Sequence, residues 1–292
     1  MALPTIPPPH PDPHAPTAFT PPPGACDAHC HVFGPGDRFP FAPGRRYTPP
    51  DAGVDDLVAL HDRLGLERAV IVQASCHGTD NAALVDALRR GDGRHAGVAM
   101  IDAATPEADL DELHAAGVRG TRVNFVAHLG GAPDLAAVER TAARVAPRGW
   151  HLVVHLDAAD LAGYAPLLDR LPCPYVIDHM ARIDATAGPD QAPFRELLRL
   201  VGGDERCWVK VTGAERLTAD GPPPYDDVVP YARALIAAAP DRVLWGTDWP
   251  HPNVRHMPDD GDLLDLLAAF APDEATRHRI LVENPARLYE FG

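Results

Sequence analysis

The sequence lacks any long hydrophobic run, and its first residues lack the features of a secretory signal. No stretch of the 292 residues holds the roughly 18 consecutive apolar residues that a transmembrane helix requires. The opening segment, MALPTIPPPHPDPHAP, has neither a basic start nor an apolar centre, which argues against a signal peptide. We therefore expect a cytoplasmic protein that has no membrane partner.

Cysteine and positive charge are both scarce. The five cysteines are odd in number, widely spread and free of any C-x-x-C pair, which argues against a disulfide framework or a structural zinc knuckle. With 26 basic and 41 acidic residues, the formal net charge is −15, and a surface of this sign repels the phosphates of a nucleic acid. We expect no nucleic-acid partner, although a local arginine cluster would still let a pocket bind a small anion.

Proline is abundant, and it dominates the first residues. Because proline fixes φ and lacks an amide donor, residues 1–24 are predicted to form an extended arm that either wraps the surface or is disordered. Residues 25–292 show no further boundary. Their length suits one large domain, since α/β barrels commonly run to about 250 residues.

After the arm, short apolar runs alternate with longer segments whose apolar residues recur at i, i+3 and i+4. The predicted strands are Ala25–His29, Ala69–Gln73, Ala96–Ile101, Gly120–Phe125, His151–His155, Tyr175–Asp178, Trp208–Thr212 and Val243–Gly246. The predicted helices are Val54–Leu64, Asn81–Arg90, Glu107–Ala116, Leu135–Ala146, Ala159–Leu171, Phe194–Val201, Asp226–Ala239 and Asp262–Phe270.

This alternation predicts a parallel sheet of the α/β class. Strands linked by crossover helices are parallel, and their nearly continuous apolar character is typical of strands buried on both faces. Eight such units close a (β/α)₈ barrel of the TIM type, which is the predicted fold. An open doubly wound sheet normally carries a glycine-rich turn after its first strand, and the segment HCHVFG at residues 29–34 is not such a turn.

Histidine and aspartate stand where the predicted strands end. His29 and His31 close the first strand, His155 the fifth, His179 the sixth, and Asp248 follows the eighth. The catalytic groups of a barrel gather at these ends, and side chains two residues apart share one face of a strand. A lone histidine is more often structural, but the coincidence of these positions favours a joint catalytic site.

This donor set suits a divalent metal such as zinc, because neutral imidazoles and a carboxylate are its usual ligands. Such an ion would activate water and polarise a carbonyl group. His179 would then serve as a general base or as an electrophile.

Other strand ends carry groups that suit an anion. Ser75 follows the second strand, Arg122 lies on the fourth, Arg182 follows the sixth, Arg216 lies beyond the seventh, and Tyr47 lies in the loop after the first. Arginine binds carboxylates in a bidentate manner, and hydroxyl groups would complete an anion site. The alternative is that each arginine pairs with a nearby carboxylate of the protein. Two cysteines beside these motifs, Cys30 and Cys76, are interpreted as packing residues.

Four segments resemble the amidohydrolase superfamily of the amidohydrolase 2 type. They are DAHCHVFGP at 27–35, VQASCHGTDN at 72–81, IDHM at 177–180 and WGTDWPHPN at 245–253. The similarity runs from about residue 25 to 290 and is strongest to the branch of 2-pyrone-4,6-dicarboxylate lactonases and sulfomuconolactone hydrolases. It implies a distorted barrel and the hydrolysis of a small anionic cyclic ester from aromatic catabolism.

In the metal-free lactonase pattern, the resemblance implies that Asp248 activates water. It implies that His29, His31 and His179 polarise the lactone carbonyl and stabilise the oxyanion. The substrate carboxylates would be held by Tyr47, Ser75, Arg122 and Arg216.

Two positions depart from that pattern. His128 replaces an arginine, which implies a less strongly charged contact with the substrate, since histidine is only partly protonated near neutral pH. His155 replaces a tyrosine and restores a histidine where metal-dependent members place a ligand. The resemblance then implies one divalent ion, expected to be zinc, held by His29, His31, His155 and Asp248, with His179 as the catalyst beside it.

The leading hypothesis is therefore a lactone hydrolase with a small anionic lactone as its partner. A metal-dependent decarboxylase of an aromatic or muconic acid, and a metal-free 2-pyrone-4,6-dicarboxylate lactonase, stay open as alternatives. A non-catalytic binding protein is disfavoured, because every expected catalytic position holds a competent residue. A homo-oligomer is compatible with the sequence, which does not reveal the oligomeric state.

Overall fold

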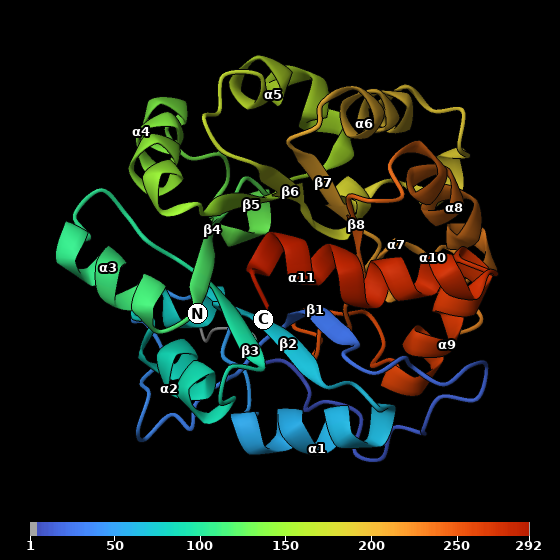
Figure 1. The fold of residues 1–292 in the computed structure, drawn as a ribbon, viewed down its shortest axis with the longest axis horizontal. Coiled ribbons are helices and arrows are strands. Elements are labelled where there is room, and N and C mark those ends of the chain that lie inside the picture. The colour runs from blue at the N-terminus through green and yellow to red at the C-terminus, as the bar shows by residue number, and fades with distance from the viewer. Residues whose placement is uncertain (1–4, 292) are drawn as a thin grey trace.

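The computed structural model describes residues 5–291. Its eight parallel strands follow one another in chain order, each hydrogen-bonded to the next, with helices around them (Figure 1). This arrangement confirms the predicted (β/α)₈ barrel. The strands are β1 (Cys26–Cys30), β2 (Arg68–Val72), β3 (His95–Ala99), β4 (Val118–Asn124), β5 (His151–His155), β6 (Tyr175–Ile177), β7 (Cys207–Lys210) and β8 (Val243–Leu244).

The last strand meets the first through single hydrogen bonds, so the barrel is nearly closed. The Ala28 amide donates to the Trp245 carbonyl at 2.9 Å, and the Asp248 amide donates to the His29 carbonyl at 2.7 Å. Gly246 allows this approach, since a Cβ atom there would lie 2.4 Å from the His29 nitrogen. The chain leaves β8 two residues earlier than predicted and runs directly against the end of β1.

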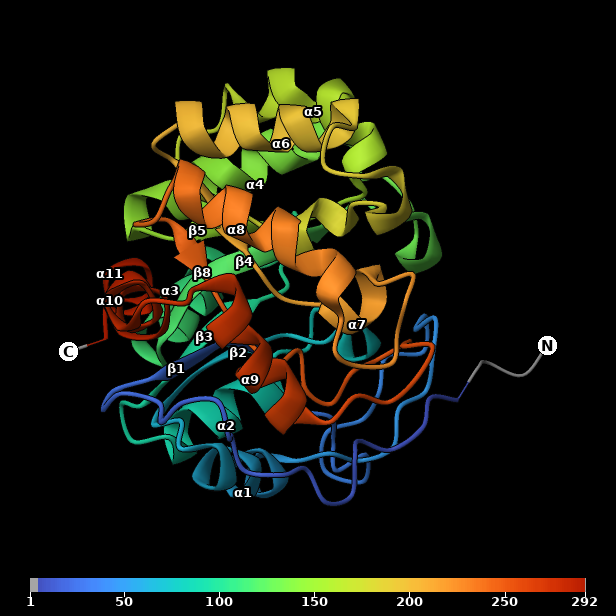
Figure 2. The ribbon, with the colours of Figure 1, turned by 90° about the vertical axis from the view of Figure 1, so that its right-hand side faces the viewer.

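The helices form the outer layer of the barrel (Figure 2). Helix α1 has the predicted bounds and turns Leu57, Leu60 and Leu64 inward, and Gly65 ends it in the left-handed region with a φ of 74°. No helix among residues 5–291 is long and apolar enough to cross a membrane. The helices are α1 (Val54–Leu64), α2 (Ala82–Arg90), α3 (Glu107–Ala115), α4 (Leu135–Val145), α5 (Leu161–Leu168), α6 (Ala192–Gly203), α7 (Ala214–Leu217), α8 (Val229–Ala238), α9 (Asp260–Phe270), α10 (Glu274–His278) and α11 (Asn284–Tyr289).

Two apolar clusters make up the core. The larger lies between strands and helices, whereas the smaller is built mainly of alternate strand residues such as Val70, Val98 and Val153. Tyr289 of α11 belongs to the smaller cluster, and α11 crosses the barrel in Figure 1. Packed side chains therefore fill the barrel, and the cavity of interest lies near the strand ends that carry His155 and Asn124.

The described part of the proline-rich arm lies against the barrel. The Thr17 amide donates to Asp265 of α9 at 2.8 Å, and Arg63 of α1 donates to Asp12 at 2.6 Å. Of the two alternatives left open by the sequence, residues 5–24 follow the one in which the arm wraps the surface.

Candidate active site

A cavity of about 40 Å³ lies where the strands end. It brings together residues from loops and strands that are far apart in the sequence. All six predicted substrate contacts line it, together with three of the predicted catalytic or metal-binding residues. These residues are Tyr47, Ser75, Arg122, His128, Arg182 and Arg216, and His31, His155 and Asp248. The two remaining predicted residues, His29 and His179, are buried beside it, with exposed fractions of 0% and 3%.

Asp248 is the point on which the first-strand histidines converge. Its Oδ1 lies 3.1 Å from Nε2 of His31 and 3.5 Å from Nε2 of His29. The Nδ1 of His31 lies 2.7 Å from the Val72 carbonyl, which can only accept, so Nδ1 carries a proton. In a neutral ring the lone pair of Nε2 then faces the carboxylate, and this contact is favourable only when a proton or a metal cation lies between them.

The ring of His155 is oriented in the same way as that of His31. The Nδ1 of His155 lies 3.1 Å from Oδ1 of Asn124, which accepts its proton, and Nε2 is buried without a hydrogen-bond partner. A ring nitrogen held by a neighbouring acceptor on one side and free on the other is the usual state of a metal-binding histidine. Suitable donor atoms of His29, His31 and Asp248 lie within 4.8 Å of one another, and His155 lies outside this group. The described residues therefore fit a divalent ion, with His155 the most distant of the four donors.

His179 reaches the site from an unusual turn. The segment Asp178–Arg182 contains consecutive left-handed residues, with φ of 50° at His179 and 51° at Arg182, and none of them is glycine. Each such residue costs roughly 1–2 kcal/mol, so the surrounding packing must stabilise the turn. Nδ1 of His179 lies 2.7 Å from the Thr212 hydroxyl, and its ring lies 4.7 Å from that of His29 and 5.5 Å from that of His155.

Burial favours the neutral form of three imidazoles, those of His29, His155 and His179. It lowers the pKa of His29 to about 3, with the Lys210 ammonium adding to the effect. Burial likewise holds the pKa of His155 and of His179 well below the usual range. Burial alone would raise the pKa of Asp248, but the Arg216 guanidinium and the imidazoles outweigh it and hold that pKa well below its ordinary value. Neutral imidazoles beside an ionised carboxylate are the state that a metal ion or a developing oxyanion requires.

Each arginine of the cavity has a carboxylate partner within the protein. Arg216 donates from Nε to Oδ2 of Asp248 at 2.7 Å, and Arg182 donates to Asp157 at 2.7 Å. Arg122 lies 3.1 Å from Asp178. The pairing alternative considered from the sequence is therefore present at all three positions, and their contact with a substrate stays a prediction.

The remaining predicted contacts are Tyr47, Ser75 and His128, which also line the cavity. Tyr47 is buried and hydrogen-bonds with Ser75, and burial raises the pKa of its phenol. His128 lies in a single turn, Ala127–Leu129, with its ring 6.4 Å from that of His155. Burial, together with the Arg182 charge, lowers the pKa of His128, so a neutral ring is favoured there. Burial raises the pKa of the Cys76 thiol to about 12, which agrees with a packing role.

Two charged residues next to the histidines, Lys210 and Asp178, were not among the predicted site residues. Lys210 is fully buried, with Nζ 2.9 Å from Nδ1 of His29 and 3.4 Å from Oδ1 of Asp178. Asp178 thus faces two cations, Lys210 and Arg122. Lys210 and Asp178 both occupy strand ends, and this position is the one signal that could have identified them.

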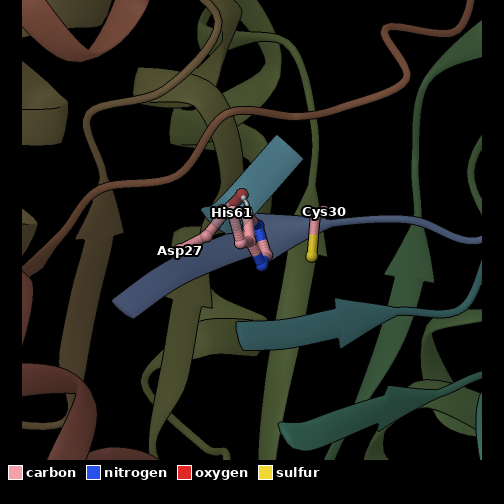
Figure 3. A group of neighbouring side chains, drawn as sticks. All are labelled: Asp27, Cys30 and His61. Carbon is pink, nitrogen blue, oxygen red and sulfur yellow. Dashed lines mark hydrogen bonds and ion pairs between the residues drawn. The ribbon is translucent and has the colours of Figure 1, made fainter. Parts of the chain in front are cut away.

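A second cluster has metal-like composition but a different role. Donor atoms of Asp27, Cys30 and His61 lie within 4.8 Å of one another, with Cys30 further along β1 (Figure 3). Asp27 accepts hydrogen bonds from the amides of His29 and Thr247 at 3.0 and 3.1 Å, from the Thr247 hydroxyl at 2.6 Å, and lies 3.1 Å from His61. With both oxygens engaged, Asp27 joins β1, α1 and the end of β8 instead of serving a metal.

Comparison with known proteins identifies relatives that match nearly the whole chain. The family model described as Amidohydrolase matches residues 26–291. The chain is 47% identical over 279 residues to the 2-pyrone-4,6-dicarboxylate hydrolase of Comamonas testosteroni, covering 93% of this chain and 92% of that protein. It is 45% identical to the 4-sulfomuconolactone hydrolase of Rhizobium radiobacter, covering 94% and 93%.

A solved structure shows the same fold. A Pseudomonas putida protein described as a 2-pyrone-4,6-dicarboxylic acid hydrolase superposes with a TM-score of 0.81 at 34% identity, covering 92% of this chain and 98% of that one. The family model matches nearly the whole barrel, and the relatives are similar over more than nine tenths of their length. Both findings lead to the same assignment. The chain belongs to the amidohydrolase family.

Proposed function

We propose that this protein hydrolyses a small anionic lactone of the pyrone or muconolactone type. The observation that carries the proposal is that Asp248 and four imidazoles lie in or beside one cavity whose walls also hold three arginines. Carboxylate and imidazoles suit the activation of water, and arginines suit an acidic substituent. Two relatives at 47% and 45% identity are named as hydrolases of such lactones, which supports the same chemistry here.

In the proposed reaction, Asp248 accepts a proton from the water that attacks the lactone carbonyl. His29 and His179 would donate hydrogen bonds to the carbonyl oxygen as negative charge develops on it. The ring C–O bond then breaks, and the proton passes to the departing oxygen. The product is one open-chain molecule that carries both the new carboxylate and the freed hydroxyl group, so the overall change consumes one water and no other reactant.

The donor set also supports a metal ion. His29, His31, His155 and Asp248 would hold it, and a bound zinc would polarise the lactone carbonyl and lower the pKa of water. The Asn124 and Val72 oxygens would keep the Nδ1 protons of His155 and His31 away from it. The fit of these residues supports zinc as the ion.

The proposed substrate contacts are the six residues of the cavity wall. Arg122, Arg182 and Arg216 would bind the acidic groups, with hydroxyl contacts from Tyr47 and Ser75. His128 would give a weaker, largely neutral contact, because its pKa is lowered.

The test is hydrolysis of 2-pyrone-4,6-dicarboxylate and of a sulfonated and a carboxylated muconolactone by the purified protein. Loss of ring absorbance with uptake of one water supports the proposal, and Asp248→Asn should lower kcat by about 10³-fold or more. If CO₂ is released without consumption of water, the protein is a decarboxylase. If it binds these lactones tightly but turns none over, it is a binding protein.

A further inference from the structure

The cavity is too small for the proposed substrate. Its volume is about 40 Å³, which suits a few water molecules, whereas sites for small organic ligands usually enclose roughly 300–1,000 Å³. Arg216 and Asp248 both line it. A lactone ring can therefore enter only when part of the wall moves.

The guanidinium of Arg216 is paired with the carboxylate of Asp248, which is the proposed base. Nε and Nη2 of Arg216 lie 2.7 and 2.5 Å from Oδ2 of Asp248, and Nη1 donates to the Pro252 carbonyl at 2.7 Å. The other oxygen, Oδ1, faces the two first-strand imidazoles. While Arg216 stays in place, the guanidinium therefore occupies Oδ2, and only Oδ1 is left for water.

Arg216 also has a second carboxylate beside it. Oε1 of Glu215 lies 3.2 Å from Nε of Arg216, and Glu215 is only 1% exposed. Among residues 5–291, neither carboxylate oxygen of Glu215 has a hydrogen-bond partner, which is a costly state for a buried polar group. A guanidinium that turned away from Asp248 would remain paired with an anion, and Glu215 would gain the hydrogen bonds that it lacks.

The other two cavity arginines differ in their partners. Arg122 pairs with Asp178 and Arg182 with Asp157. Asp178 lies 3.3 Å from Nδ1 of His29, whereas Asp248 faces the other ring nitrogen, Nε2. An anion that binds Arg122 or Arg182 therefore does not take the place of Arg216 at Asp248. An anion that binds Arg216 competes directly with Asp248.

We propose that Arg216 masks Asp248 in the ligand-free enzyme and that the anionic group of the substrate unmasks it. This inference rests on the proposed function. The substrate carboxylate or sulfonate takes the guanidinium from Asp248, Glu215 keeps its contact with Arg216, and the movement opens the cavity. A neutral lactone leaves the mask in place, so the anionic group determines turnover as well as binding.

The experiment measures binding of isophthalate, an unreactive benzene dicarboxylate, by titration calorimetry. Asp248→Asn should bind it about tenfold more tightly than wild type, because the ligand no longer competes for Arg216. Arg216→Met should bind it more weakly, and adding Asp248→Asn to that variant should give no tightening. Arg216→Gln serves as a second uncharged variant if the methionine variant does not fold.

Two results would overturn the exchange. One is an Asp248→Asn variant that binds isophthalate no more tightly than wild type. The other is equal tightening with and without Arg216, which would indicate general repulsion by the Asp248 charge. Lactone assays separate this inference from the proposed function. If no lactone is hydrolysed but the isophthalate pattern appears, the exchange stands without that function; if lactones are hydrolysed and the pattern is absent, the exchange is wrong.

Discussion

Single nitrogen atoms decide how the candidate site can be used. His31 and His155 each direct Nδ1 at an acceptor of the protein, so each keeps a lone pair on Nε2. Asn124, on the neighbouring strand, fixes the ring of His155. The orientation of His155 in the site therefore depends on one side-chain amide. The residues that hold the donors are thus as informative as the donors themselves.

We predict that the protein binds about one zinc ion per chain when purified without chelator or nickel affinity, as a single site of this donor set requires. His155→Ala should lose the metal, because it removes one of four ligands. His128→Ala is the matched control and should keep the metal, since His128 lies outside the donor set. Elemental mass spectrometry measures both.

A metal-free wild type whose activity is unaffected by chelators would contradict this prediction. His155 would then be a substrate contact, and Asp248 would act on water with the imidazoles alone.

The positions of the site residues followed from the sequence, but their partners did not. Strand-end rules placed His29, His31 and Asp248 in one region, where their donor atoms indeed gather. Arg216 lies on the short helix α7, which places it near Asp248. A helix of four residues is too short to show a helical pattern in the sequence, so this pairing could not be predicted. Buried partners such as Glu215 carry no local sequence pattern, because their contacts come from distant elements.

Among the elements, helix ends connect the barrel to its arm. Asp259 is the N-cap of α9, where its side chain accepts from the Gly261 amide, and the same carboxylate accepts from the His14 amide at 3.1 Å. One side chain thus both begins a helix and holds the arm. The Asp134 carboxylate begins α4 by the same capping bond, and its other contact is with Arg140 of the same helix.

We predict that Asp259→Ala and Asp134→Ala each lower the free energy of unfolding by about 1 kcal/mol, the usual value of an N-cap. Only Asp259→Ala should also loosen the arm. Limited proteolysis should then cleave residues 5–24 faster in that variant than in wild type or Asp134→Ala. Equal cleavage in all three would show that the arm is held by its other contacts.

Element types were predictable because the apolar periodicity is strong, as in α1, whose bounds agree at both ends. Short elements could not be predicted from the sequence. Helices α7, α10 and α11 and the left-handed turn at Asp178–Arg182 were missed, since the turn contains no glycine to signal a positive φ. Strand β8 was predicted too long, because the chain bends toward β1 at Gly246.

At the scale of the whole molecule, buried histidines make stability depend on pH. His151 begins β5, at the opposite end of that strand from His155, with both ring nitrogens buried and unpartnered. Burial, and then the Lys210 charge, lower its pKa to about 3 from 6.5. Between these values the unfolded chain binds a proton that the native state does not, so stability rises with pH across this window and is lost as pH falls.

We predict that His151→Leu weakens this pH dependence. Removing one such proton should reduce the slope of unfolding free energy by up to about 1.4 kcal/mol per pH unit between about pH 3 and 6.5. Urea unfolding at several pH values measures the slope, and His278→Leu, at a half-buried position, is the control that should change it less. A slope that stays the same in His151→Leu would mean that the native protein accommodates the charge.

The contact between Asp27 and Thr247 joins residues 220 positions apart in the sequence. Because His29 and Asp248 adjoin this contact, a growing chain holds its first histidines long before the aspartate that completes the set exists. Fragments that end before β8 contain most of the donor residues but lack Asp248, so the site is incomplete in them. Activity therefore requires that the last strand has been synthesised and has docked against the first.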